Sequence, residues 1–374
     1  MAEATPDVWI DVSAALTQRA GIARYVRGLT EALVAMDPAD RGFTLGTYSH
    51  SWRDAGARPF EVPHASTPLL VRPWRLQLLA GHALRRRILP GVRSVGRFIA
   101  TDMAVPFADA NDVIATVYDM TTFTHPQAHS LLTRVNARIA LSRIRSRGYR
   151  VVAISNRTAR DATRLAGIEP SRISVIHPGV SEAFLEVPTP DAIEEALAKY
   201  GVLRPFAITV GTLEPRKNLR RLITAFRSVA TPNESLIIVG ARGWGADASI
   251  GDEFKGVGNV RAIGFVPDAD LACLYHACAT FVLPSLSEGY GFPVAEALAC
   301  GANVICSREC GVVEVVPDTV AIVDPLNIEG MAEALRVCMD MAPVERRPVI
   351  PRTYAQAAIA HASLVSDQYH AHAT

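Results

Sequence analysis

Lysine is nearly absent from this chain. Of 38 basic residues only three, Lys199, Lys217 and Lys255, are lysines, and the other 35 are arginines. A lysine in a loop is therefore unusual here and calls for an explanation. Binding of nucleic acid is not expected, because the arginine-rich stretches lack interleaved aromatic residues and no recognition module is present.

Paired cysteines and long apolar runs are also missing. The six cysteines form no CxxC pair, which argues against a zinc site and a disulfide framework and favours a reducing cytoplasm. No apolar run approaches the roughly 18 residues that a membrane-spanning helix needs. The first residues are acidic and do not resemble a signal sequence. Any membrane contact is therefore expected to be peripheral.

The net charge of +1 hides a division between the halves of the chain. Residues 1–187 carry +7 and residues 188–374 carry −6. Much of the positive charge lies in two stretches without acidic residues, Arg72–Arg97 and Arg134–Arg150. The first also contains Trp74 and several leucines, so we predict a basic amphipathic helix that lies on anionic lipid. A solvated arginine face, or one that meets an acidic glycan, is the alternative.

Short β-branched or apolar runs alternate with helical patterns along the chain. The expected strands are VWIDV, FTLGTY, VIATVYD, RVVAIS, ISVIHPG, FAITVG, SLIIVG, VRAIG, TFVLPS, NVICS and VAIVD. This alternation predicts two doubly wound α/β domains with parallel sheets, which bind ligands at the carboxyl ends of strands. The proline-rich, acidic stretch 188–199 marks the break. The predicted domains are 1–187, joined by a C-terminal helix within 354–374, and 188–353.

The most informative segment is SEGYGFPVAEALACGA, residues 287–302. It places two carboxylates, Glu288 and Glu296, eight positions apart. The glycines between them let backbone approach a ligand, and Pro293 suits the first turn of a helix. A helix start favours phosphate, and carboxylates accept hydrogen bonds from hydroxyls. Phosphate together with a polyol indicates a nucleotide sugar; an ordinary strand, loop and helix is the alternative.

A second segment, VGTLEPRKNLRRLITAF, carries Arg216 and Lys217 in a loop that follows a buried strand. Arginine offers a planar fork for phosphate oxygens and lysine a mobile point charge. Together they could neutralise a diphosphate without a metal, whereas a solvated basic turn is the alternative.

Three other signals are discounted. Asp268 and Asp270 form a DxD, but they precede a helical pattern and are expected to act as a helix N-cap instead of a metal site. The glycines at 240–245 have the wrong spacing for a dinucleotide fingerprint. The histidines His361, His370 and His372 are expected to be solvated.

The chain resembles retaining, GT-B fold glycosyltransferases of the GT4 type. The shared motifs are GTLEPRKN, IIVGARGWG, the segment Gly264–Gly301, ISNRTARD followed by IHPGV, and more weakly GIARYV and YDMTTFTHP. They cover most of the chain, densely in its second half, and are most similar to the bacterial branch that contains polysaccharide and O-antigen mannosyltransferases. The resemblance implies two Rossmann-like domains that face each other across a cleft, with the C-terminal helix crossing back to the first domain.

The resemblance also assigns residues. Glu288 and Asp119 are expected to be catalytic. Donor binding is expected from Gly21, Arg216, Lys217, Gly289, Gly291, Phe292 and Glu296. Further candidates are Arg24 and His125, although a structural role beside Pro126 is the alternative for the histidine. The family commonly has histidine before the aspartate, and this chain has Tyr118, which removes a polar group and leaves Asp119 as the expected hydroxyl ligand.

The implied reaction moves a hexose from a nucleotide diphosphate sugar to a hydroxyl of a growing bacterial surface glycan or lipid-linked saccharide. The first choice of donor is GDP-mannose, which would supply mannose. Configuration is retained, the leaving phosphate accepts the acceptor's proton, and no metal or cofactor is needed. We expect a cytoplasmic protein that contacts the cytosolic face of the inner membrane through Arg72–Arg97. A nucleotide-sugar epimerase of the same fold, or a non-catalytic glycan-assembly subunit, are the alternatives.

Overall fold

The computed structural model describes residues 6–17, 21–50, 60–67, 95–102, 110–243, 247, 249–253, 259–341 and 348–366. It divides the chain into two compact units. The first contains Met1–Gly179 and Arg352–Thr374, and the second contains Val180–Pro351. The first unit ends at Gly179 instead of the predicted residue 187, and it resumes at Arg352 instead of residue 354. The acidic stretch that was expected to mark the break is instead a helix of the second unit, α8 (Pro190–Tyr200).

The first unit is built on a parallel sheet with the strand order β3-β2-β1-β4-β5-β6-β7. Its strands are β1 (Val8–Asp11), β2 (Leu45–His50), β3 (His64–Thr67), β4 (Val95–Ala100), β5 (Ala110–Val117), β6 (Arg150–Ala153) and β7 (Ile173–Val175). The strand order reverses between β1 and β4, which makes their carboxyl ends the topological switch point of this unit.

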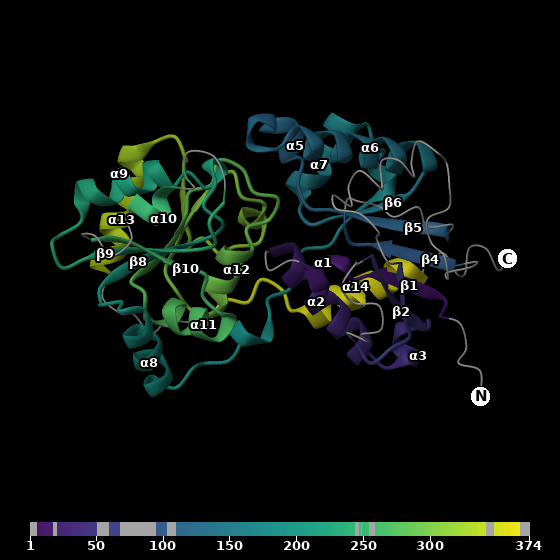
Figure 1. The fold of residues 1–374 in the computed structure, drawn as a ribbon, viewed down its shortest axis with the longest axis horizontal. Coiled ribbons are helices and arrows are strands. Elements are labelled where there is room, and N and C mark those ends of the chain that lie inside the picture. Colours follow the sequence, from purple (N-terminus) through teal and green to yellow (C-terminus); the bar gives the residue numbers. More distant parts are fainter. Residues whose placement is uncertain are drawn as a thin grey trace. The chain divides into compact units, whose positions relative to one another are not determined.

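Helices cover both faces of this sheet (Figure 1). On one face lie α1 (Ser13–Thr17), α2 (Gly21–Ala35), α3 (Pro38–Arg41) and α14 (Tyr354–Ser366). On the other lie α5 (Thr121–Thr124), α6 (Leu131–Arg147) and α7 (Asn156–Ala166). Two of these helices end at glycines in the left-handed conformation: Gly148 ends α6 and Gly167 ends α7.

The second unit has a parallel sheet with the order β10-β9-β8-β11-β12-β13. Its strands are β8 (Phe206–Val210), β9 (Ser235–Val239), β10 (Val260–Gly264), β11 (Thr280–Leu283), β12 (Val304–Ser307) and β13 (Ala321–Val323). The chain moves from β8 outward to β10 and then returns to the other side of β8. The switch point therefore lies between β8 and β11.

The helices of the second unit also form two layers. One layer contains α9 (Leu219–Val229), α10 (Ile250–Glu253) and α13 (Ile328–Asp340), and the other contains α8, α11 (Asp268–Ala277) and α12 (Phe292–Ala299) (Figure 1). The apolar face of α9 and buried residues of α13 pack with side chains of β8, β9 and β11 in one continuous core. This packing fixes the strand ends from which the functional loops leave.

All eleven predicted strands are present, and the described residues contain two more, β3 and β4, that were not predicted. β3 is a short, polar edge strand that pairs with β2, and β4 lies between β1 and β5. Because β4 begins at Val95, the last three residues of the predicted basic helix Arg72–Arg97 are strand, and that part of the prediction is wrong. Residues 72–94 of the prediction lie outside the described residues.

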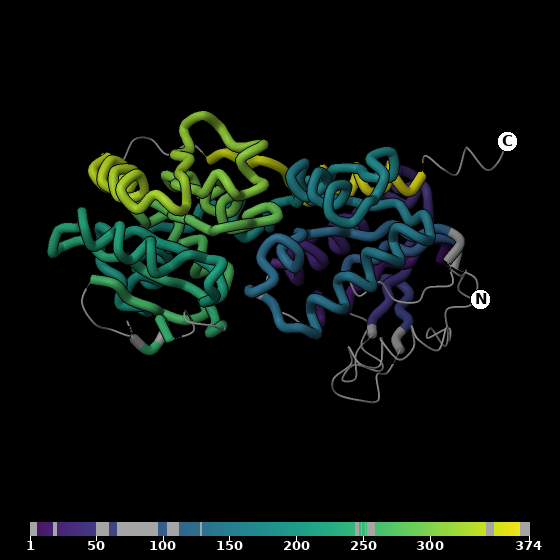
Figure 2. Tube along the Cα trace, turned by 90° about the horizontal axis from the view of Figure 1, so that it is seen from above, coloured from purple at the N-terminus to yellow at the C-terminus, as the bar shows by residue number. Residues whose placement is uncertain are grey.

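The C-terminal helix packs within the first unit, as predicted. In Figure 2 the yellow C-terminal segment runs among the purple and blue segments of that unit. α14 lies against α2, where a Cβ built on Gly28 would come within 2.4 Å of the Tyr354 ring. Glycine at position 28 therefore permits the close contact of the two helices.

The expectation that His361 is solvated is wrong. Only 1% of its surface is exposed. Its Nδ1 lies 2.8 Å from the Ala357 carbonyl, so this nitrogen donates, and Nε2 accepts from the Tyr25 hydroxyl at 3.1 Å. Burial lowers the pKa of His361 to about 4. Both His370 and His372 lie outside the described residues.

The six cysteines are buried and free. Within the described part of the chain, no helix combines the length and the apolar character needed to cross a membrane.

Candidate functional site

The carboxyl ends of β8 and β11 carry the two charged motifs of the second unit. These strands are neighbours at the switch point of the sheet. The loop after β8 contains the short 3₁₀ helix Pro215–Lys217, and the loop after β11 contains Glu288. The two loops are joined directly, because the Leu286 amide donates to the Arg216 carbonyl at 2.8 Å. The sheet topology therefore brings together motifs that are 71 residues apart in sequence.

Lys217 is buried although it carries a charge. Its stem passes over Gly211, where a Cβ would lie 2.8 Å from the Lys217 Cε. The neighbouring strand approaches equally closely, since a Cβ on Gly240 would lie 1.9 Å from the Gly211 carbonyl oxygen. Two glycines at adjacent strand ends therefore provide the space in which the lysine reaches the centre of the site.

Asn218 holds the turn that carries the two cations. It adopts the left-handed conformation with φ of 59°, which asparagine tolerates better than most residues. Its side-chain amide donates to the carbonyls of Pro284 at 3.1 Å and Pro325 at 2.7 Å. These carbonyls follow β11 and β13, so one buried side chain ties the Arg216–Lys217 turn to two other loops.

Glu288 lies at the centre of an ion cluster. Its Oε1 is 2.6 Å from Lys217 Nζ, and its Oε2 is 2.7 Å from Arg216 Nη1. Ser285 Oγ donates to the same Oε1 at 2.8 Å. Burial alone would raise the pKa of Glu288, but the two cations and the hydrogen bonds outweigh it and lower the pKa to about 2. The side chain therefore remains a carboxylate at any physiological pH.

Glu214 completes the cluster and was not predicted. Its Oε1 lies 2.5 Å from Arg216 Nη2, while Arg216 Nη1 also donates to the Ser287 carbonyl at 2.8 Å. The side chains of Glu214, Arg216, Lys217 and Glu288 are each 11 to 15% exposed. Sequence offered a signal for Glu214, a carboxylate two positions before the arginine in the same loop. Asn218 and Ser285 gave no comparable signal, since each looks like an ordinary loop residue.

The helix start that the sequence predicts around Pro293 is present as the beginning of α12. Gly291 precedes α12 with a positive φ of 106°, and Phe292 and Pro293 form the first turn. Glu296 lies one turn further along and is 4% exposed. The loop that contains Gly289 is held at Glu288, whose amide donates to the Glu309 carbonyl at 3.0 Å.

In the first unit, the predicted Asp119 follows β5. Its Oδ1 accepts from the Thr121 amide at 2.8 Å and from the Thr121 hydroxyl at 2.6 Å. The same hydroxyl lies 2.9 Å from His129 Nε2. These two bonds to Thr121 orient the Asp119 carboxylate just before α5, whose N-cap is Met120.

Tyr118 points into the unit and donates its hydroxyl to the Thr101 carbonyl at 2.6 Å. Its ring meets Tyr25 edge to face, with centroids 5.4 Å apart. Thr101 in turn donates to the Asp11 carbonyl at 2.5 Å. Because Asp11, Thr101 and Tyr118 end or follow β1, β4 and β5, these bonds connect three adjacent strand ends at the switch point of the first unit.

The remaining predicted residues of the first unit are Gly21, Arg24 and His125. Gly21 is the first residue of α2, and Arg24 lies in its first turn with its side chain partly buried. His125 ends α5, and its Nδ1 lies 3.0 Å from the Thr124 hydroxyl.

The expectation that Asp268 or Asp270 caps a helix is wrong. The N-cap of α11 is Pro267, without a side-chain cap bond, and both aspartates lie in the first turn. Asp270 instead accepts from Lys199 and from the Tyr200 hydroxyl, each at 2.7 Å. In the described ranges, no group of three or more His, Cys, Asp and Glu side chains could hold a metal ion.

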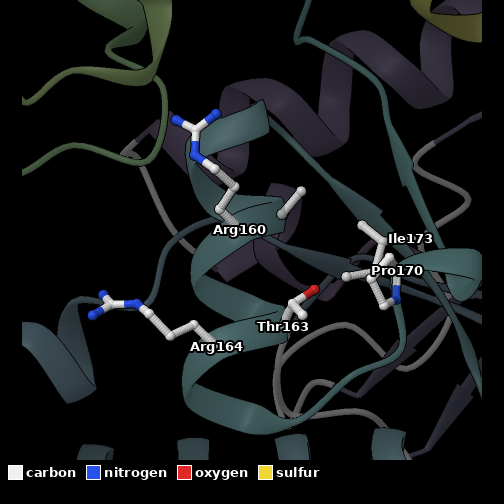
Figure 3. A pocket seen from close by; sticks show the side chains of 6 residues that line it. Arg160, Thr163, Arg164, Pro170 and Ile173 are labelled. Atoms are coloured by element: carbon white, nitrogen blue, oxygen red, sulfur yellow. The ribbon is translucent and has the colours of Figure 1, made fainter.

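A hollow of about 330 Å³ lies on the first unit, between α7 and the edge strand β7. Figure 3 shows Arg160 and Arg164 projecting from α7, with Pro170 and Ile173 across from them. The lining is mostly apolar and includes none of the predicted site residues. The ion cluster around Glu288 is therefore the better candidate site.

The chain is similar to known proteins over part or all of its length. The sequence profile of the family described as Glycosyl transferases group 1 matches residues 191–350. The O-antigen chain mannosyltransferase B of Escherichia coli is 30% identical over 225 residues, which are 59% of this chain and 59% of that protein. The chain thus spans less than two thirds of this relative's length.

Solved structures share the fold at low identity. Anabaena HepE, in complex with UDP and glucose, superposes with a TM-score of 0.63 at 18% identity, over 99% of each chain. WaaG, a glycosyltransferase involved in lipopolysaccharide biosynthesis, gives 0.64 at 18% identity, over 96% of this chain and 95% of WaaG. Residues 191–350 therefore match the family of glycosyl transferases group 1, and the chain shares with these solved glycosyltransferases a fold of two Rossmann-like α/β domains.

Proposed function

We propose that this protein is a retaining glycosyltransferase that moves a hexose from a nucleotide diphosphate sugar to a hydroxyl of a growing bacterial surface glycan or lipid-linked saccharide. One observation carries the proposal. Arg216, Lys217 and Glu288 meet at the switch point of a group 1 domain, which is where open α/β sheets bind ligands.

The chemistry of the cluster suits this reaction. A nucleotide diphosphate sugar already has a good leaving group, so the protein needs chiefly to stabilise negative charge on the departing diphosphate and to position the acceptor. Arg216 and Lys217 supply that stabilisation, together with the start of α12 at Gly291 and Phe292. Glu288 binds hydroxyls of the donor sugar, and Glu296 binds the ribose.

The first unit supplies the acceptor side. We assign Asp119 to a hydroxyl of the acceptor, and Gly21 at the start of α2, with Arg24 in the same turn, to donor binding. The leaving phosphate takes the acceptor's proton on the same face of the sugar, which retains the anomeric configuration. This route requires neither a covalent nucleophile nor a metal.

Mannose from GDP-mannose is the first choice of donor, because the relative that matches 59% of this chain is described as an O-antigen mannosyltransferase. HepE was solved with UDP and glucose, so a protein of this fold accommodates a nucleotide together with a sugar, but at 18% identity the likeness shows the fold alone. We place the reaction in the cytoplasm, with a peripheral contact to the inner membrane through the part of the predicted basic stretch that precedes β4, residues 72–94.

Incubation with a panel of nucleotide sugars and mannose-terminated acceptors tests the proposal. We expect acceptor-dependent release of nucleoside diphosphate, lost in Lys217→Ala. Lys199→Ala is the matched control, because Lys199 also forms an ion pair but its side chain is 59% exposed on α8. Conversion of the sugar without acceptor would indicate an epimerase, and failure to bind any donor would indicate a non-catalytic subunit.

A further inference from the structure

The two cations assigned to the donor's phosphates are already occupied in the structure. Glu288 presents one carboxylate oxygen to Lys217 and the other to Arg216, at 2.6 and 2.7 Å. A carboxylate that spans two cations in this way has the same charge-assisted geometry as a phosphate group. Glu288 therefore occupies the position that an anionic ligand would need.

The charges of the cluster cancel. Glu214 holds the second nitrogen of Arg216, so two carboxylates face two cations. All four side chains are largely buried, at 11 to 15% exposure, so that solvent screens them poorly. A diphosphate that joined this cluster unchanged would be placed beside Glu288 and repelled by it.

We propose that Glu288 is an internal substitute for the donor's diphosphate. In the absence of donor it neutralises Arg216 and Lys217, and the incoming phosphate oxygens replace it on both cations. The exchange frees the Glu288 carboxylate for hydroxyls of the donor sugar. This inference rests on the proposed function and adds that the sugar-binding carboxylate becomes available only when the diphosphate is bound.

The local backbone permits this exchange by a side-chain movement. Both backbone polar groups of Glu288 are hydrogen-bonded. Its amide donates to the Glu309 carbonyl at 3.0 Å, and its carbonyl accepts from the Gly311 amide at 3.3 Å. The backbone therefore stays in place while the carboxylate turns about its side-chain torsions. Glu214 continues to hold Arg216 during the exchange.

Calorimetric titration of Glu288→Gln tests the proposal, because glutamine keeps the shape of the side chain and removes its charge. We expect inorganic pyrophosphate, GDP and UDP to bind at least about tenfold more tightly than to the wild type, or about 1.4 kcal/mol. Guanosine and uridine, which lack phosphate, should show no gain. Glu333→Gln is the matched control, since it neutralises an exposed carboxylate paired with Arg336 on α13 of the same unit.

The outcomes separate this inference from the proposed function. If the wild type binds nucleoside diphosphates and Glu288→Gln binds pyrophosphate equally or more weakly, the exchange is wrong and the proposed function stands. If neither protein binds any diphosphate, the proposed function fails and the exchange with it. If Glu288→Gln does not fold, Ser285→Ala decides, because it removes only the hydroxyl that donates to Glu288. We then expect pyrophosphate affinity to rise about threefold, and an unchanged affinity would refute the exchange.

Discussion

Replacing Glu288 by glutamine should reduce the dependence of the free energy of unfolding on pH. In the folded protein burial opposes the carboxylate, but Arg216, Lys217 and Ser285 outweigh it and lower the pKa from 4.5 to about 2. A carboxyl group with a lower pKa in the folded state stabilises the fold above its unfolded pKa. That contribution is lost as the pH falls through the folded pKa.

The size of the effect follows from the shift. A difference of about 2.5 units corresponds to about 3 kcal/mol at pH 7. The Glu288 side chain is only 12% exposed, so solvent screening removes little of this. Linkage then predicts that the contribution falls by about 2 kcal/mol between pH 7 and pH 3, where the folded carboxylate begins to protonate.

Urea unfolding of the wild type and Glu288→Gln, at a series of pH values from 7 to 3, measures this contribution. Hydrogen exchange on peptides from β8 and β11 assigns it to the second unit. We expect the variant to be less stable at pH 7 and its deficit to shrink by about 2 kcal/mol on acidification to pH 3. A deficit that stays constant over this range would refute the assigned charge network. Glu333→Gln, at an exposed ion pair, should show a much smaller pH dependence.

Three further results are expected. Asn218→Gly keeps the left-handed turn but loses the hydrogen bonds to two buried carbonyls. The free energy of unfolding should therefore fall by about 2 kcal/mol and the KM for the donor should rise. A melting temperature equal to that of the wild type would contradict this. Burial lowers the pKa of His361 to about 4, so the wild type should lose stability as the pH falls from 6.5 to 4. His361→Gln should lack this pH dependence in thermal unfolding. A variant with the same pH profile as the wild type would count against a neutral buried histidine. Transfer should proceed fully in EDTA, and a strict need for Mn²⁺ or Mg²⁺ would direct attention back to Asp268 and Asp270.

The sequence predicted the strands well because buried parallel strands are continuous apolar runs bounded by turns. The runs that became β8 and β11 show this clearly. The two missed strands lack that signature. β3 reads HAST and lies at an edge, and β4 begins beside an arginine-rich stretch whose charge suggested a different structure.

The errors at His361 and Asp270 arose in the same way. Each residue was judged by its type and its immediate neighbours. The buried residues of α14 are Tyr354, Ala357, Ala358, His361, Ala362 and Val365, which recur at helical spacing, so the periodicity did contain the signal that His361 faces inward. Asp270 is different, because its partners Lys199 and Tyr200 come from a helix 70 residues earlier and no local pattern announces them.

The sequence by itself determined the fold class and the identity of the charged residues, because alternating apolar periods and a glycine-flanked carboxylate are local properties of a chain. Only the tertiary structure decided that Glu288 lies between Arg216 and Lys217, since that contact depends on β11 returning to the far side of β8. The low pKa of Glu288 and the occupied state of both cations follow from this placement. They arise from burial and proximity, which exist only once the sheet has formed.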